Sequence, residues 1–322
     1  MIYFILFVFS IVFTLVVRYI ALKKSLLDIP NDRSSHVLPT PRGGGVAIVV
    51  TFYIGLFYLF FVAHQIEREL FLGLLAGIPI ALISFLDDIY TLSAKIRLVV
   101  QISSSFLALY LVGGFSQTLY GVSLDGWLLN IFVVLCMVWL TNLFNFLDGI
   151  DGYASSEAIF ISMSAYVLFH EAIFLVLTVS VLGFLIFNWH KASIFMGDVG
   201  SAFLGFIFAV FVLYFSREFD AVSTWIVLLG LFWFDATLTL LRRLMNGEKL
   251  STAHKKHAYQ RLVQVGFSHE KVVLLGMGVN LIGFLVLLSL DENNFYLFVP
   301  VYILFIYILV LIVDRYRKFD KD

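Results

Sequence analysis

Polar side chains recur at a fixed spacing in the segment 142–152. Asn142, Asn145 and Asp148 stand three residues apart, and Asp151 continues the series. On a helix, positions three apart lie along one slowly drifting face. The segment follows a long apolar run, so this face would lie at a membrane boundary, where unpaired polar groups are costly unless they bind something. The spacing predicts a binding site, and the alternative is a helix end with ordinary cap residues.

Three further acids are candidates for catalysis. Asp87 and Asp88 directly follow another apolar run, with Lys95 and Arg97 shortly after. Adjacent carboxylates beside a membrane can hold a divalent cation or act as a base, or they can be solvated caps. Asp198 has glycines on both sides, which leaves room for a metal and a phosphate to reach it. Taken alone, this acid would equally be a helix N-cap.

A glycine-rich segment is a candidate phosphate cradle. Arg42 is followed by Gly43, Gly44 and a third glycine, and such backbone can approach a ligand closely with its N–H groups facing phosphate. Arg33 and Arg42 are candidate partners for phosphate oxygens. The alternative is a basic loop that binds lipid headgroups.

The longest basic segment contains His254, His257 and Arg261. The histidines stand three residues apart and Arg261 four residues further on, a helical spacing that can form one cationic face suited to a diphosphate. Two histidines could instead bind zinc, but no third ligand stands nearby and the neighbouring residues are cationic. A solvated basic loop is the remaining alternative.

The composition indicates what positions these residues. Apolar residues make up 61% of the chain, charged residues 13%, and the mean hydropathy is +0.99. Soluble domains carry about 25% charged residues, so the chain reads as an integral membrane protein. The net charge of −1 does not suggest a nucleic-acid partner. With Cys136 as the single cysteine, neither a disulfide nor a cysteine metal site is expected.

Apolar runs long enough to cross a bilayer recur along the chain. We therefore expect an all-α, polytopic integral membrane protein with ten to eleven transmembrane helices, forming one domain over residues 1–322. The eleven expected spans are 2–22, 46–63, 70–86, 98–114, 127–144, 154–169, 171–188, 199–216, 221–241, 271–290 and 295–313.

The distribution of Lys and Arg predicts the orientation. If the N-terminus is outside, the inside segments hold seventeen of these residues and the outside segments only two, Arg68 and Arg217. Cytoplasmic loops carry the excess of positive charge, so we expect the N-terminus outside and the C-terminus in the cytoplasm. Every polar cluster described above then lies on the cytoplasmic face.

Together, these clusters predict phosphoryl transfer at a membrane surface. Carboxylates and substrate phosphates bind Mg²⁺, with Mn²⁺ as a substitute, and the cations suit the remaining phosphate charge. The expected substrates are a cytosolic nucleotide derivative and a lipid of the inner leaflet.

The motifs also resemble a known family, the polyprenyl-phosphate N-acetylhexosamine-1-phosphate transferases, which include the MraY and WecA enzymes. The resemblance runs from about residue 28 to 265. It rests on Pro39-Thr40-Pro41-Arg42-Gly43-Gly44-Gly45, Asp87-Asp88, Asn142-x-x-Asn145-x-x-Asp148-Gly149-x-Asp151-Gly152, Met196-Gly197-Asp198-x-Gly200-Ser201 and His254-x-x-His257-x-Tyr259-Gln260-Arg261.

The resemblance implies that a UDP-N-acetylhexosamine and undecaprenyl phosphate react, with Mg²⁺, to give the undecaprenyl-diphosphate sugar and UMP. Asp198 then resembles a metal ligand, with Asp88 and Asn145 beside it, and Asp87 resembles the base that deprotonates the lipid phosphate. The implied catalytic set is Asp87, Asp88 and Asp198. The candidate substrate-binding residues are Arg42, Gly43, Gly44, Lys95, Arg97, Asn142, Asn145, Asp148, Asp151, His254, His257 and Arg261.

The basic loop distinguishes branches of the family. It lacks the His-His-His run of the peptidoglycan enzyme, so UDP-MurNAc-pentapeptide is the less expected donor. It is more similar to the branch that initiates O-antigen or related surface polysaccharides of lipopolysaccharide and cell wall biogenesis in the bacterial inner membrane. That branch implies GlcNAc or a 6-deoxy sugar such as FucNAc or QuiNAc.

Three other classes remain as alternatives: an ion-coupled transporter, a structural protein of a polysaccharide assembly complex, and a lipid phosphatase. A transporter would place ionisable groups near the bilayer midplane, whereas the acid clusters here stand at the ends of spans. The sequence leaves open the sugar, the prenol, whether the chain is a monomer or a homodimer, and whether transfer is direct or passes through a covalent intermediate.

Overall fold

The apolar runs form helices, because backbone polar groups in lipid must pair within their own segment. The computed structural model describes residues 1–30, 38–119, 122–216, 219–250, 252, 254–290 and 295–319. Its helices are α1 (Ile2–Lys23), α2 (Gly45–Phe61), α3 (Arg68–Leu75), α4 (Ile78–Tyr90), α5 (Ala94–Val112), α6 (Trp127–Leu147), α7 (Tyr153–Phe169), α8 (Ala172–Asn188), α9 (Asp198–Phe215), α10 (Phe219–Leu228), α11 (Gly230–Met245), α12 (Ala258–Gln264), α13 (His269–Ser289) and α14 (Phe295–Tyr316).

The expected all-α membrane fold is confirmed. Within the described residues, seven helical segments are long and apolar enough to cross a membrane, and the bent pair α10 and α11 would be an eighth. Three shorter apolar helices, α2, α7 and α8, have 17 residues each. These segments follow the eleven expected spans in order.

Two expected spans are interrupted. The span expected at 70–86 consists of α3 and α4, which separate at Ala76 and Gly77. The span expected at 221–241 consists of α10 and α11, whose axes differ by 71°. A Cβ at Gly230, where α11 starts, would come within 2.6 Å of the Tyr302 ring on α14, so the bend is packed closely against that helix.

Helix α9 forms the centre of the bundle and packs against α2, α3, α4, α5 and α6. Its side chains Phe203, Phe206, Phe208 and Phe211 are fully buried. A Cβ at Gly205 would lie 2.6 Å from the Leu140 carbonyl oxygen of α6, so this glycine allows the two helices to approach closely. Close packing of this kind positions the start of α9 against the end of α6.

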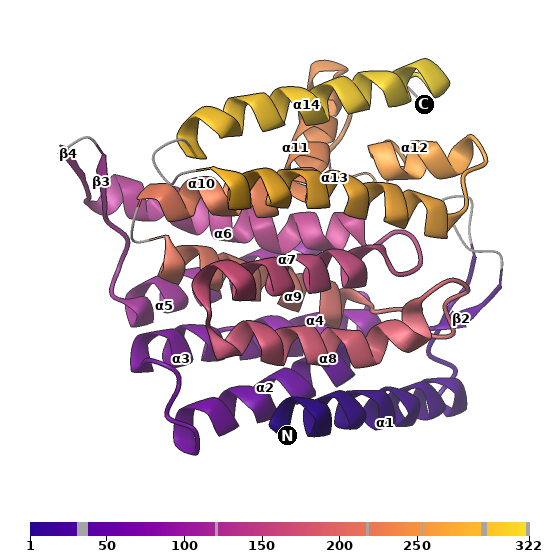
Figure 1. Ribbon diagram of the computed structural model, residues 1–322. Helices are drawn as coiled ribbons and strands as arrows, with labels where there is room; N and C mark the ends of the chain where they lie inside the picture. Colours follow the sequence, from indigo (N-terminus) through magenta and orange to yellow (C-terminus); the bar gives the residue numbers. More distant parts are fainter. Residues whose placement is uncertain are drawn as a thin grey trace.

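Two short hairpins were not expected from the sequence. Strands β1 (Leu27–Asp28) and β2 (Thr40–Pro41) pair antiparallel, as do β3 (Gln117–Leu119) and β4 (Val122–Leu124). Figure 1 shows the β3–β4 hairpin at the left end of the bundle and β2, α12 and the C-terminus at the right end. The chain therefore brings the glycine-rich segment and the basic loop to the same end.

Candidate active site

Arg97 joins two of the candidate acids. Helix α4 ends at Tyr90, Thr91 adopts a left-handed conformation, and α5 turns back so that Arg97 faces the end of α4. The Arg97 Nη1 atom lies 2.6 Å from Asp87 Oδ2 and 2.8 Å from Asp198 Oδ2. One guanidinium thus holds together two carboxylates from distant parts of the sequence.

Asp88 has a different position from its neighbour. Its side chain is buried, and its two oxygens accept hydrogen bonds from the backbone N–H groups of Asp198 and Val199, both over 3.2 Å. A Cβ at Gly197, where φ is +73°, would lie 2.6 Å from Asp88 Oδ2. The carboxylate of Asp88 therefore satisfies free N–H groups at the start of α9, and Gly197 makes room for it.

The amides of α6 lie beside these acids. The Asn145 side chain donates to Ser201 Oγ on α9 over 3.1 Å and also hydrogen-bonds Asp198. Asn142 pairs with Gln101 of α5, donating to its Oε1 over 2.7 Å. The amide face that the sequence predicted on α6 is present, but Asn142 already has partners within the protein.

Asp148 follows the last residue of α6 and lies among like charges. Burial, together with the charges of Asp198, Asp88 and Asp151, raises the pKa of the Asp148 carboxyl well above its ordinary value. A group in this position gains from a cation nearby, because a positive charge would offset the repulsion between the acids.

The glycine-rich segment differs from the expected phosphate cradle. The Gly44 N–H donates to the Phe195 carbonyl over 2.9 Å, and the Gly45 N–H donates to the Met196 carbonyl over 2.8 Å. A Cβ at Gly45 would lie 2.3 Å from Gly200 Cα, so the glycine permits close contact with the start of α9. The expectation that the Gly44 N–H faces phosphate is therefore wrong, because the Phe195 carbonyl accepts that N–H.

The other candidate residues for substrate phosphates in this part of the site are Arg42, Gly43 and Lys95. Arg42 donates through its guanidinium to the Asp88 backbone carbonyl, which places its charge beside the acids. Gly43 has a φ of +90° and open space around its Cβ position. Lys95 is exposed in the first turn of α5. Arg33 lies outside the described residues.

The basic loop reaches the acids through Tyr259. The Tyr259 hydroxyl donates to the Phe146 carbonyl at the end of α6 over 3.1 Å, and a Cβ at Gly149 would lie 2.2 Å from that hydroxyl. His257 is buried, with its Nδ1 atom 3.8 Å from Asp235 Oδ2, and the Ala258 N–H donates to Asp235 over 2.9 Å. The loop is thus attached to the amide segment and to α11.

The expected cationic face of this loop is wrong at Arg261. His257 is the N-cap of helix α12, which begins at Ala258, and the His257 carbonyl accepts the Arg261 N–H over 3.0 Å. Arg261 is buried and pairs with Asp314 of α14, and its guanidinium lies 5.6 Å from the Phe319 ring. It faces the C-terminal helix.

His254 is uncharged at neutral pH in this structure. Burial, with the nearby His257 and Arg243, lowers the pKa of His254 to about 3. The rings of His254 and His257 lie 5.0 Å apart. A contact from His254 to a diphosphate would therefore be a hydrogen bond from a neutral imidazole.

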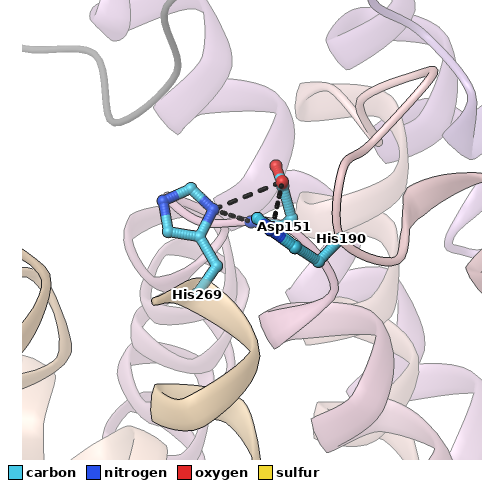
Figure 2. Close-up of side chains that lie close together, drawn as sticks. All are labelled: Asp151, His190 and His269. Carbon is cyan, nitrogen blue, oxygen red and sulfur yellow. Dashed lines mark hydrogen bonds and ion pairs between the residues drawn. The ribbon is translucent and has the colours of Figure 1, made fainter. Parts of the chain in front are cut away.

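Asp151 meets two histidines that the sequence interpretation did not single out. Figure 2 shows Asp151, His190 and His269 converging from three segments of the chain. The Asp151 Oδ2 atom lies 3.3 Å from His269 Nδ1 and 3.5 Å from His190 Nδ1. Both histidines stand in segments that the distribution of Lys and Arg assigns to the inside. This shared side was the one signal in the sequence that could have grouped them with Asp151.

The charge state of Asp151 follows from these contacts. Burial raises the pKa of Asp151, but the hydrogen bond to His269, the Ala192 N–H and the charges of both histidines outweigh it and hold this pKa below its ordinary value. Asp151 is therefore ionised at neutral pH.

The fold and this acid-lined end define a class: a polytopic helical membrane protein with a polar site at one end of its bundle. The glycosyl transferase family 4 model matches residues 70–216. A "Probable undecaprenyl-phosphate N-acetylglucosaminyl 1-phosphate transferase" of Bacillus subtilis is 30% identical, covering 97% of this chain and 92% of its own length. The chain belongs to glycosyl transferase family 4.

Relatives with two kinds of name are similar to this chain. An "Undecaprenyl-phosphate alpha-N-acetylglucosaminyl 1-phosphate transferase" of Thermotoga maritima is 29% identical over 78% of each chain. A "Phospho-N-acetylmuramoyl-pentapeptide-transferase" of Latilactobacillus sakei is 31% identical, covering 84% of this chain and 88% of its own length. The resemblance to the polyprenyl-phosphate sugar-1-phosphate transferases is confirmed.

Proposed function

We propose that this protein transfers N-acetylglucosamine 1-phosphate from UDP-GlcNAc to undecaprenyl phosphate in the bacterial cytoplasmic membrane. The observation that carries the proposal is Arg97, whose guanidinium holds Asp87 and Asp198 within 2.6 and 2.8 Å. Two carboxylates side by side at one end of a membrane bundle support the roles of Asp87 as base and Asp198 as metal ligand. The names of the Bacillus and Thermotoga relatives support the sugar and the acceptor.

The reaction exchanges one phosphorus–oxygen bond for another. An oxygen of the lipid phosphate forms a bond to the sugar-linked phosphorus of the donor, and the bond from that phosphorus to the bridging oxygen breaks, releasing UMP. Asp87 takes the proton of the lipid phosphate when it is a monoanion. Arg97, Arg42 and the basic loop bind and orient phosphate oxygens during the exchange.

The residues present fit a magnesium ion. Asp198 and Asn145 offer hard oxygen ligands, and Mg²⁺ needs few protein ligands when substrate phosphates and water complete its shell. Asp88 is the weaker candidate, since both of its oxygens already accept N–H groups. When bound, the ion would neutralise charge on the phosphates. Activity is then expected to require Mg²⁺ or Mn²⁺ and to stop in EDTA.

The test is incubation of the purified protein with radiolabelled UDP-GlcNAc and undecaprenyl phosphate. Label should enter chloroform-extractable lipid and UMP should be released in equal amount. Release of inorganic phosphate instead would indicate a lipid phosphatase. Absence of any labelled lipid, with uptake of solute into vesicles, would indicate a transporter and overturn the proposal.

A panel of UDP-sugars tests the finer assignment. UDP-GlcNAc should be used in preference to UDP-FucNAc, UDP-QuiNAc and UDP-MurNAc-pentapeptide. The same step would then initiate O-antigen or a related envelope polysaccharide. Preferred use of the pentapeptide donor would move the protein to the peptidoglycan branch, which the Latilactobacillus relative represents by name.

A further inference from the structure

The cluster of Asp151, His190 and His269 does not include the acids that Arg97 joins, and only Asp151 of the three is also a candidate substrate-binding residue. It contains one carboxylate and two imidazoles whose ligand atoms all lie within 4.8 Å of one another. In the part of the chain that the structure describes, it is the one group of three such side chains that meets this distance. We propose that it is a binding site for a transition-metal ion, with Zn²⁺ as the reference ion, separate from the magnesium site.

The distances fit a tetrahedral ion better than an ion pair. Two ligand atoms each about 2.0–2.1 Å from a tetrahedral zinc lie about 3.3–3.4 Å apart. The Asp151 Oδ2 atom lies 3.3 Å from His269 Nδ1 and 3.5 Å from His190 Nδ1. Charge-assisted N–H to carboxylate hydrogen bonds are shorter, about 2.7–2.9 Å.

The nitrogen atom of His269 that faces Asp151 is also suited to a metal. The backbone N–H of Asp151 lies 3.3 Å from His269 Nδ1 in donor geometry, so this nitrogen can offer its lone pair when the imidazole is neutral. A bound ion would take that lone pair in place of the long hydrogen bond. The Ala192 N–H donates to Asp151 Oδ2 over 3.2 Å and orients the carboxylate, as partners of metal ligands do.

The ligand types select the ion. Imidazole nitrogen with one carboxylate suits zinc and its neighbours in the first transition series, whereas magnesium prefers oxygen ligands alone. The side chain of His190 is 33% exposed, so an ion can enter from solvent. Three protein ligands leave a fourth position for water or another small ligand.

The ion would connect three segments that surround the candidate active site. Asp151 lies in the turn after α6 that carries Asp148, His190 in the loop that leads to Asp198, and His269 at the first residue of α13. Joining them restrains the two loops next to the acids. Zinc should therefore raise the melting temperature, by roughly 2–4 °C at a hundredfold excess over its dissociation constant.

The test measures metal retention without either substrate. The full-length protein in detergent is stripped with chelator, loaded with Zn²⁺ or Co²⁺ in excess Mg²⁺, desalted and analysed for metal. We expect about one equivalent per chain, the visible absorption of tetrahedral cobalt, and an affinity lowered more than about 100-fold in His190→Gln and His269→Gln. Asp198→Asn and His254→Gln serve as controls that keep the ion.

Two outcomes would overturn the proposal: wild-type protein that retains no ion after desalting, or His190→Gln protein that retains it as wild type does. Loss of the ion in Asp198→Asn alone would show that zinc had bound at the acids instead. Melting curves without metal check that each variant folds. If His269→Gln does not fold, His190→Gln alone still tests the proposal. The test does not measure transferase activity, so failure of this proposal and failure of the proposed function are distinguishable.

Discussion

The carboxylate of Asp88 accepts a hydrogen bond from the backbone N–H of Asp198 over 3.2 Å, although the residues stand 110 positions apart. The second residue of the acid pair thus attaches to the helix start that carries the third acid. Its neighbour Asp87 faces Arg97 instead. Adjacent acids therefore have different tasks: one supports the site and the other remains directed at it.

Replacing Asp88 should affect stability as well as activity. In Asp88→Asn one oxygen is replaced by an N–H₂ group, which cannot accept the N–H groups of Asp198 and Val199. We expect a loss of about 1–3 kcal/mol in the free energy of unfolding, read as a lower melting temperature in detergent. The exposed Glu69→Gln is the matched control. Equal melting temperatures for the two variants would contradict the supporting role.

Asp87→Asn and Asp198→Asn should fail in different ways. If Asp87 is the base, the rate of Asp87→Asn falls steeply but recovers in part at higher pH, because more of the lipid phosphate, with a second pKa near ~6, is already a dianion. Asp198→Asn should instead need more Mg²⁺, with no gain at higher pH. Measuring the rate of both variants across pH and Mg²⁺ concentration distinguishes these two kinds of failure. Rescue of Asp87→Asn by Mg²⁺, or of Asp198→Asn by pH, would exchange the roles.

His254 and His257 should matter for the donor. Both lie in the loop that Tyr259 attaches to α6, so His254→Ala and His257→Ala should weaken use of the UDP-sugar more than of the lipid. The loss of interaction free energy with the UDP-sugar should be on the order of 1.5–3 kcal/mol for a charge-assisted contact. It should be smaller for His254, which is neutral. Kinetics with each substrate varied in turn measure the effect. A change confined to the KM for undecaprenyl phosphate would count against it.

The low pKa of His254 has a consequence for stability. The unfolded chain binds a proton near the ordinary value of 6.5, whereas folded His254 does so near 3. Folding stability from this residue is therefore complete above pH 6.5 and falls as the pH is lowered toward 3. Melting curves recorded from about pH 7.5 down to about pH 5 should show a smaller loss of melting temperature for His254→Gln than for wild type. Equal losses of melting temperature in the two proteins would argue against this contribution of His254.

The orientation is testable by labelling. The excess of Lys and Arg on one side predicts that Ser116 is outside and Lys249 inside. Both residues are exposed. In a Cys136→Ala background, an impermeant thiol reagent added to intact cells should label Ser116→Cys and spare Lys249→Cys. The reverse pattern would invert the topology and place the acids outside, away from a cytosolic nucleotide.

Arg261 should act through α14. Asp314 accepts ion pairs from both Arg242 and Arg261, and Arg261 is buried. Asp314→Asn leaves the buried guanidinium without its charged partner, so we expect about 2–5 kcal/mol of destabilisation or local release of the loop. Limited proteolysis within residues 242–270 measures that release. The exposed Arg315→Gln on the same helix is the control, and equal cleavage of both variants would refute the prediction.

Much of this protein could be predicted from the order of its residues alone. Apolar runs of membrane length must form helices, because lipid offers no partner for a free backbone group. Their positions and order followed directly, and so did the assignment of Asp87, Asp148 and Asp198 to the same end of the bundle, since each stands at the end of a run. The helix breaks near Gly77 and Leu229 did not, because apolar residues continue across them.

Only the tertiary structure decided which polar groups meet. In a membrane, helix neighbours are selected by close packing and not by hydrophobicity, so apolar runs do not encode their partners. Gly205 and Gly45 determine how closely α9 approaches, and that approach places Asp88 at its N-terminus. Arg261 faces Asp314 because α12 packs against α14. Asp151, His190 and His269 are separated by long stretches of chain, and no spacing rule joins them; packing of α13 against α7 does so.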